Sequence, residues 1–460
     1  MKKHLLAISA AAVLLAPQAV GAEGFSINEW SAEGFGMGGA RMFAENDAAN
    51  MAYNPAAMTK IEGQKAKVSL AYIAPHGKWE ADNVATGQEF NGRNRVNPAL
   101  VPGMYYVKQL NDTEWLGMAT YTRFGNMCQF ERDSLVGTNA FSSRLNGVSL
   151  GMNYAKKLDK KLSASVGAEI NYVGLVLDKN LSAAAGSIHD PSAKDKTEAM
   201  INAGIAAGKI TREQVAAYQQ AADKAGQNLL DGKGDTPLHI KGESVALGWN
   251  AALNYEFDDK NEVGVVYRSK VKHSMEADYD MHGFGAFWNG GHQYGDAYGC
   301  VTLPESWMLG YGHKFDEKTR MEFNATWTRW SRFDAFWMNV DPAILNQTTL
   351  GGVKNWKDGW RYAIGIEHKL SDKYSLLAGM AHDERGIPDE TGDFMVPTGE
   401  RDTYTLGIQY HDKKQTIAAS FGYMDVGDMR MHGHGADAYK NAKMYDSYTK
   451  IVVLSYQYNF

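Results

Sequence analysis

Two arginine side chains are the residues of this sequence best suited to bind an anion. Arg268 follows an alternating apolar and polar run, and Arg361 lies within another such run. Both fall on the polar face, where a guanidinium group can hold a carboxylate by two parallel hydrogen bonds. Arg268 and Arg361 are therefore candidates to bind an anionic headgroup. Glutamates share this face, so mutual pairing is the alternative, and a bulge would change the side on which either arginine lies.

Other residue types that support catalysis or cofactor binding occur without the required context. The run from Gly34 to Gly39 lacks the preceding strand and following helix that a nucleotide-binding loop needs. His432 and His434 have a spacing that a metal ion could use, but an exposed polar turn is the simpler interpretation. No local nucleophile motif is present. We therefore expect no cofactor, no bound metal and no enzymatic activity, although a hydrolase built from non-local residues is an alternative.

Residues 1–22 have the pattern of a secretion signal, with an apolar stretch and small residues before Glu23. The apolar stretch is shorter than the roughly 20 residues that span a membrane as a helix. Export to an oxidising compartment allows a disulfide between Cys128 and Cys300, which both lie in or beside long connections; two free thiols are the alternative. The net charge of -6 does not favour a nucleic-acid partner.

The elements that would position these residues are strands. Apolar and polar residues alternate from Ile451 to the terminal Phe460, and also across 147–154, 244–257 and 360–367. Soluble sheets alternate too, but long strands whose apolar faces end in aromatic residues fit strands that cross a bilayer. A terminal aromatic residue such as Phe460 resembles the signal read by the barrel assembly machinery. We therefore expect that machinery and outer-membrane lipid as partners, and a location in the outer membrane of a Gram-negative cell.

Short turns and long connections alternate along the chain. Short polar turns lie at 111–114, 159–161, 258–260, 316–318, 371–373 and 412–414, and long connections cover roughly 76–99, 126–143, 180–240, 279–299, 336–355, 385–400 and 427–444. Six turns and seven long loops predict fourteen antiparallel strands, an all-β transmembrane barrel over residues 61–460. The even number of strands places both chain ends on the periplasmic side.

Residues 23–60 precede the first strand and do not alternate. They are rich in Gly, Ala and Asn, and near their end stand Asn54, Pro55 and Ala56, where proline removes a backbone donor. A barrel of fourteen strands is too wide for its own side chains to fill. We therefore predict that residues 23–60 form a plug inside the barrel.

The longest connection, 180–240, contains apolar residues at helical spacing. Thr211 and Gln214 form a candidate capping box, and Gly208 suits the end of a preceding helix. We predict two short helices on the extracellular side, which serve either as a lid or as part of a surface that captures ligand.

Several of these stretches resemble FadL-type outer-membrane transporters. They are GFSINEWSAEGFGMGGARMFAENDAANMAYNPAAMTKI near the start, LPESWMLGYGHKF at 303–315, TWTRWSRFD at 326–334, WKDGWRYAIGIEHKLSDKYSLLAGMAHDE at 356–384 and PTGERDTYTLGIQY at 397–410. The resemblance implies a fourteen-stranded barrel closed by an N-terminal hatch. It also implies passive uptake of hydrophobic molecules, either long-chain fatty acids or aromatic or aliphatic hydrocarbons.

The resemblance further implies a route and residues along it. Ligand is captured between extracellular loops, where Phe284, Phe287 and Trp288 would contact it, and passes to a pocket inside the barrel. Movement of the hatch around Asn54, Pro55 and Ala56 then opens a lateral route through a kinked third strand. Gly117 is the candidate kink. A general porin for small hydrophilic solutes is the alternative, which the plug disfavours.

Overall fold

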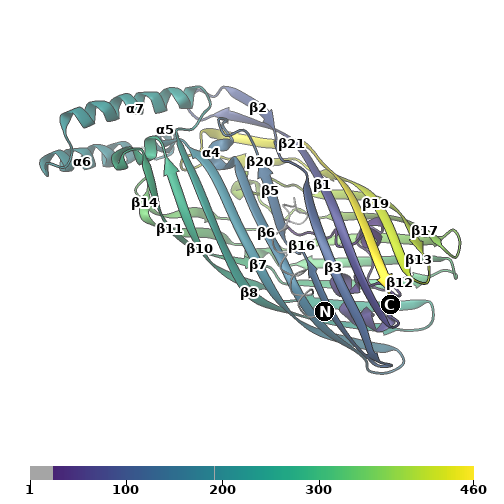
Figure 1. The fold of residues 1–460 in the computed structure, drawn as a ribbon. Coiled ribbons are helices and arrows are strands. Elements are labelled where there is room, and N and C mark those ends of the chain that lie inside the picture. Colours follow the sequence, from purple (N-terminus) through teal and green to yellow (C-terminus); the bar gives the residue numbers. More distant parts are fainter. Residues whose placement is uncertain (1–23, 191) are drawn as a thin grey trace.

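The computed structural model describes residues 24–190 and 192–460, in which one antiparallel sheet closes on itself as a barrel (Figure 1). Strand β1 (Gln64–Asn83) pairs with β3 (Ala99–Asn111) on one side and with the last strand, β21 (Tyr439–Asn459), on the other. The predicted barrel of fourteen strands is confirmed. The predicted signal peptide and Glu23 lie outside the described residues.

Nine of the fourteen strands are continuous and five are each interrupted once. The continuous strands are β1, β3, β6 (Ser142–Lys157), β7 (Leu162–Leu181), β8 (Thr236–Glu256), β17 (Tyr374–Asp383), β18 (Arg401–His411), β19 (Gln415–Val426) and β21. The interrupted strands are β4 (Glu114–Tyr121) with β5 (Gly125–Gln129), β9 (Asn261–Arg268) with β10 (Val271–His282), β11 (His292–Leu303) with β12 (Ser306–Lys314), β13 (Thr319–Thr328) with β14 (Ala335–Ile344), and β15 (Gln347–Val353) with β16 (Gly359–Lys369). The short strands β2 (Glu89–Arg93) and β20 (Met429–His432) extend the sheet at the extracellular end.

The six predicted short turns are present at one end of the barrel. In four of them an aspartate accepts hydrogen bonds from two backbone N–H groups that follow it: Asp159, Asp258, Asp316 and Asp412. The predicted long connections are only partly loops, because strands continue into them. Residues 336–355, for example, are mostly the β14–β15 hairpin, which turns at Leu345 and Asn346 with φ of 47° and 62°.

The two faces of the barrel follow the predicted alternation. On β8, Val245, Leu247 and Trp249 are exposed on the outside, whereas Asn250 and Asn254 are buried inside. The interruption between β9 and β10 shifts this alternation, since Arg268 and Ser269 are both buried and the next residue is exposed. Among the described residues, no helix is both long enough and apolar enough to cross a membrane.

The 180–240 connection folds as three helices rather than the predicted two: α5 (Ala183–His189), α6 (Ser192–Ala206) and α7 (Arg212–Leu230). The capping box is confirmed, because the Thr211 hydroxyl accepts from the Gln214 N–H while the Gln214 side chain accepts from the Thr211 N–H. Gly208 ends the preceding helix with φ of +68°. The helices project from the end of the barrel opposite the C-terminus (Figure 1).

The N-terminal segment from Gly24 lies inside the barrel and is almost wholly buried. It contains α2 (Ala32–Gly36), α3 (Asn50–Tyr53) and the 3-10 helix η1 (Pro55–Lys60). We call residues 24–60 the hatch. The remaining short elements are α4 (Gly137–Ala140), η2 (Phe284–Asn289), η3 (Trp330–Arg332) and η4 (Asp389–Thr391).

Candidate functional site: hatch, wall interruption and loop aromatics

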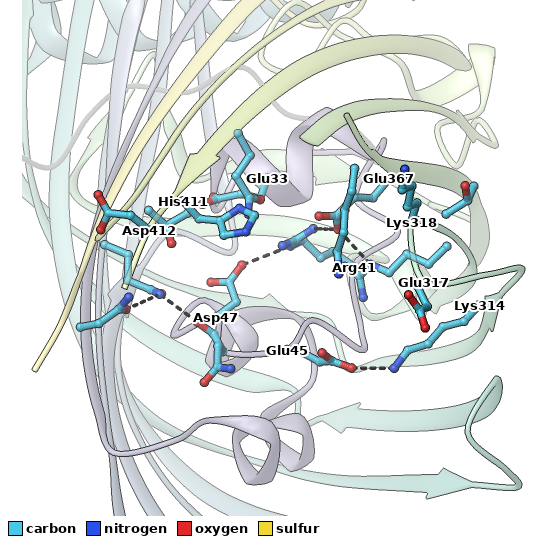
Figure 2. Close-up of a pocket in the computed structure, with 18 of the residues that line it drawn as sticks. Glu33, Arg41, Glu45, Asp47, Lys314, Glu317, Lys318, Glu367, His411 and Asp412 are labelled. Atoms are coloured by element: carbon cyan, nitrogen blue, oxygen red, sulfur yellow. Dashed lines mark hydrogen bonds and ion pairs between the residues drawn. The ribbon is translucent and has the colours of Figure 1, made fainter. Parts of the chain in front are cut away.

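Buried ion pairs hold the hatch to the barrel wall. Lys67 of β1 lies 2.9 Å from Glu33 and 2.6 Å from Asp47 of the hatch. Arg41 of the hatch lies 3.1 Å from Asp47 and 3.2 Å from Glu367 of β16, so the chain of charges crosses the lumen (Figure 2). Removing one member of a buried pair leaves an uncompensated charge and costs about 3–5 kcal/mol. These contacts therefore favour the closed position of the hatch.

The sequence reasoning missed these hatch residues as functional. The available signal was the presence of several charged side chains, among them Glu33, Arg41 and Asp47, in a segment otherwise rich in Gly and Ala. Charged residues are rarely buried unless they are paired. A plug that buries charged side chains therefore requires partners of opposite charge on the lumen wall.

Arg268 and Arg361 also bind the hatch, and their contact with a ligand headgroup stays a prediction. The Arg268 guanidinium donates to the Ala52 carbonyl at 2.5 Å, at the end of α3. The Arg361 guanidinium donates to the Gly38 carbonyl at 2.9 Å and pairs with Asp383 at 3.1 Å. Both arginines thus hold backbone carbonyl groups of the hatch against the wall.

Asn54, Pro55 and Ala56 form the start of η1. The Asn54 side-chain oxygen accepts from the Ala56 N–H at 3.1 Å, and its amide nitrogen donates to Asn254 of β8 at 3.3 Å. Pro55 occupies the first helical position, where its missing N–H is not needed. The motif therefore fixes the turn into η1 and ties it to the wall; its role in hatch movement stays a prediction.

A cavity of about 900 Å³ lies at the periplasmic end of the barrel, between charged residues of the hatch and the short turns (Figure 2). Charged side chains line most of it, including Arg41, Asp47, Lys314 and Glu367, and Lys314 pairs with Glu45 at 2.6 Å. Ligand pockets are lined mainly by apolar and aromatic side chains. This cavity is a solvated vestibule, and its chemistry does not suit an apolar ligand.

The third transmembrane strand is interrupted at Thr122–Phe124, not at Gly117. Gly117 pairs with Val107 on one side and Asn153 on the other, within the continuous part of β4. A Cβ atom at Gly117 would lie 2.4 Å from the Met51 sulfur. The glycine therefore allows the hatch to approach the wall, and the predicted kink at this position is wrong.

The interruption leaves a stretch of wall without a strand ladder. Within the described residues, β5 forms a ladder with β6 only, so its other edge has no strand partner. On that side β3 pairs with β4 only from Met104 onward, and this ladder does not reach β5. The first residues of the hatch occupy the place of the missing partner. The Ile27 N–H donates to the Arg123 carbonyl at 2.8 Å, and the Gly125 N–H donates to the Phe25 carbonyl at 2.8 Å. The hatch thus completes the hydrogen bonding of an incomplete wall.

Five aromatic rings surround this junction, and we call them the junction cluster. The ring of Phe25 lies 4.8 Å from Trp330, 5.7 Å from Phe333, 5.7 Å from Trp356 and 5.9 Å from Phe124, between ring centroids. A cavity of about 60 Å³ lies beside the wall interruption, far below the roughly 300–1,000 Å³ of ordinary ligand pockets. A sizeable ligand can enter here only when the hatch or these rings move.

A second aromatic group lies in the extracellular loops. The ring of Tyr218 on α7 lies 5.2 Å from Phe284, 5.3 Å from Phe287 and 5.0 Å from Trp288, and all four side chains are half-buried. We call these four residues the loop cluster. The structure brings together the two connections that were expected to form a capture surface. Tyr218 is the centre of this cluster, because its ring contacts the other three.

Asp235 joins the same loops. Its carboxylate accepts from the Ala183 N–H at 3.1 Å and from the Thr236 hydroxyl at 2.6 Å. Burial raises the pKa of the Asp235 carboxyl to about 6. The folded loops thus hold this proton more tightly than the unfolded chain, and the stability that protonation contributes is lost as pH rises through about 6.

Cys128 and Cys300 are both free thiols, so the disulfide considered from the sequence is not formed. Cys128 lies on β5 and is buried inside the barrel, whereas Cys300 lies on β11 and is exposed on the outer face. The alternation of side chains along strands places them on opposite faces of the wall. Their position within strands, rather than in long loops, is the reason that the expectation failed.

We expect a maleimide reagent to label Cys300 in the folded protein and to leave Cys128 unmodified. Burial inside the barrel keeps the reagent from the Cys128 thiol. Mass spectrometry of the labelled protein would give one adduct before denaturation and two after it. Two adducts on the folded barrel, or none after denaturation without reductant, would contradict this arrangement.

Residues 12–460 match the protein-family model described as "Outer membrane protein transport protein (OMPP1/FadL/TodX)". A long-chain fatty acid transport protein of Escherichia coli O6:H1 is 25% identical over 439 residues, which cover 93% of this chain and 90% of that relative. A Pseudomonas aeruginosa FadL homologue superimposes with a TM-score of 0.77 at 17% identity, over 95% of this chain and 100% of that one. The Pseudomonas putida toluene transporter TodX gives 0.64 at 18% identity, over 94% and 99%.

Proposed function

Because the chain belongs to the OMPP1/FadL/TodX family of outer-membrane transport proteins, we propose that it takes up hydrophobic molecules passively. It is an outer-membrane β-barrel, and its candidate ligands are long-chain fatty acids and aromatic or aliphatic hydrocarbons. The observation that carries the proposal is the wall interruption at Thr122–Phe124, which the hatch itself completes. A movable segment that forms part of the wall couples hatch movement to opening of the wall.

The proposed route starts at the loop cluster and ends in lipid. An apolar molecule leaves water for the aromatic side chains of the loops, with a gain of roughly 25 cal/mol per Å² of apolar surface buried. It then reaches the junction cluster inside the barrel. Displacement of Phe25 and its neighbours frees space there and exposes the unpaired edge of β5. The molecule leaves through this gap into the outer-membrane lipid, so no energy source is needed.

The proposal also names the partners of the barrel and excludes two other functions. We infer that the C-terminal strand β21, with Phe460 directly after it, engages the barrel assembly machinery, and that outer-membrane lipid receives the transported molecule. The proposal contains no catalytic step. The general porin considered from the sequence is disfavoured by the hatch, whose residues are almost all buried across the lumen.

Uptake by cells tests the function and the loop cluster together. In a Gram-negative host without its own long-chain fatty acid transporter, we expect the wild-type protein to support uptake of radiolabelled oleate or toluene. The substitution Trp288→Ala removes a ring stacked on Tyr218, and a lost aromatic contact of about 1 kcal/mol lowers uptake about fivefold at limiting ligand. Saturating ligand should restore most of the rate.

Tyr294→Ala provides the matched control, since Tyr294 is an aromatic residue on the adjacent strand with 75% of its surface exposed. We expect it to leave uptake unchanged at both ligand concentrations. If cells with the wild-type protein take up neither ligand faster than cells with an empty vector, the proposed function is wrong. If the wild-type protein transports ligand and Trp288→Ala transports it equally well, the proposed function stands and the capture role of the loop cluster fails.

A further inference from the structure

Three potential metal ligands converge on the outer face of the β10–β11 hairpin. His282 of β10 pairs directly with His292 of β11, and Asp280 lies two residues before His282 on the same face. The Asp280 Oδ1 atom lies 2.9 Å from Nε2 of His282 and 3.0 Å from Nε2 of His292. Ligand atoms of all three residues lie within 4.8 Å of one another. The strand ladder fixes this arrangement, because it sets which side chains share a face.

The group lies beyond the lipid-facing band of the barrel. On β8, the exposed apolar positions end at Val245, and the next outward residues are Glu243, Lys241 and His239. His239 pairs in register with Asp280. The hairpin therefore carries the three ligands into the polar layer outside the membrane. Their side chains are 53%, 49% and 47% exposed for His282, His292 and Asp280, so an ion has access from water.

We propose that Asp280, His282 and His292 bind a divalent transition-metal ion, with Zn²⁺ or Cu²⁺ as the fitting ions. Two imidazole nitrogens and one carboxylate oxygen are a ligand set that both ions accept, and each bond would be about 2.0–2.2 Å long for Zn²⁺. Without an ion, the Asp280 Oδ1 atom lies at hydrogen-bonding distance from the Nε2 atoms of both histidines. The ion would replace those protons and leave at least one position open to water or to a ligand from outside.

The two imidazole rings must turn to bind one ion. Their centroids lie 4.2 Å apart with only 10° between the planes, and both lone pairs cannot point to the same ion from parallel planes. The exposure of both side chains allows rotation without disturbing the strands. Asp280 can stay in place, since its Oδ1 already lies between the two Nε2 atoms.

The histidines that the sequence suggested do not form such a group. His432 contacts the Asn441 side chain at 3.0 Å, and His434 contacts the backbone carbonyl of His432 at 3.2 Å. In the part of the chain that the structure describes, Asp280, His282 and His292 form the one group of three or more potential ligands within reach of a common ion.

Metal binding by the full mature protein tests the proposal. The protein is purified in detergent without a polyhistidine tag and titrated with ZnCl₂ by isothermal calorimetry. We expect one bound Zn²⁺ per chain, and a loss of affinity greater than about tenfold in the double variant His282→Ala/His292→Ala. Asp280→Asn should also weaken binding. With CuCl₂, electron paramagnetic resonance should give nitrogen hyperfine splitting in the wild type and lose it in the double variant.

The double variant His432→Ala/His434→Ala is the matched control, since it removes two other loop histidines. It should bind Zn²⁺ as the wild type does, and circular dichroism should give the same β signal for all variants. The proposal is overturned if the wild type binds no Zn²⁺, or if removal of His282 and His292 leaves binding unchanged. Transport of hydrophobic ligand is a separate readout, so failure here would not affect the proposed function.

Discussion

Deletion of residues 24–57 is expected to turn a closed barrel into one that conducts ions steadily. In planar bilayers, we expect the deletion variant to carry an ohmic current at least about tenfold larger than that of the wild type, because a barrel of fourteen strands is too wide to be filled by its own wall. In cells the same variant should lose selective uptake of oleate or toluene. The deletion removes both the plug and the segment that completes the wall at Thr122–Phe124.

The barrel should tolerate this deletion. Lys67, Glu367, Arg268 and Arg361 lose their hatch partners, but their charges then face water in an open lumen rather than a dry interior. An uncompensated charge is costly mainly where it is buried. Circular dichroism should therefore give an unchanged β signal. A deletion variant that folds but does not conduct would mean that other residues block the lumen, and the hatch would not be the plug.

A disulfide between the hatch and the wall interruption is expected to stop transport. Ser26 and Phe124 form an antiparallel bridge whose hydrogen bonds come from the residues on either side. Such a pair has Cα atoms about 4.5 Å apart, within the range that a disulfide can span. Ser26→Cys with Phe124→Cys, in a chain that carries Cys128→Ser and Cys300→Ser, should therefore crosslink. We expect uptake to fall to the level of an empty vector.

Reduction of the disulfide gives the internal control. Because reduction frees the hatch without changing the sequence, uptake should return to that of the same variant before oxidation. The two single-cysteine variants should transport equally with and without oxidant. They also measure any effect of losing the Phe124 ring from the junction cluster. Undiminished uptake by the crosslinked protein would mean that ligand does not need the first hatch residues to leave the wall.

Predictions that rest on neighbouring residues were the most accurate. Alternation with a period of two depends only on local residue order, so it identified the strands and, with the turns, their number. The same holds for the capping box of Thr211 and Gln214 and for Gly208 at the end of a helix. Each depends on residues only a few positions apart in the sequence, and the structure confirms both. The absence of alternation in residues 23–60, together with the width of a fourteen-stranded barrel, predicted a plug before any contact was known.

Predictions that needed a distant partner were less accurate. The sequence placed Arg268 and Arg361 on the inner face but could not identify the hatch carbonyl groups that they bind. It put the kink at Gly117, although the wall is interrupted a few residues later, where hatch backbone replaces the missing ladder. It treated Cys128 and Cys300 as neighbouring loop residues, although they face opposite sides of the wall.

The sequence by itself thus determined the barrel, its strand number, the plug and the helical insert, because these follow from periodicity, turn chemistry and size. Only the tertiary structure decided which residues meet. Strand register and the interruptions in five strands set those contacts, and a shift of one residue moves a side chain to the other face. The pairing of Arg41 with Glu367 across the lumen, and of His282 with His292 across a hairpin, depends on that register.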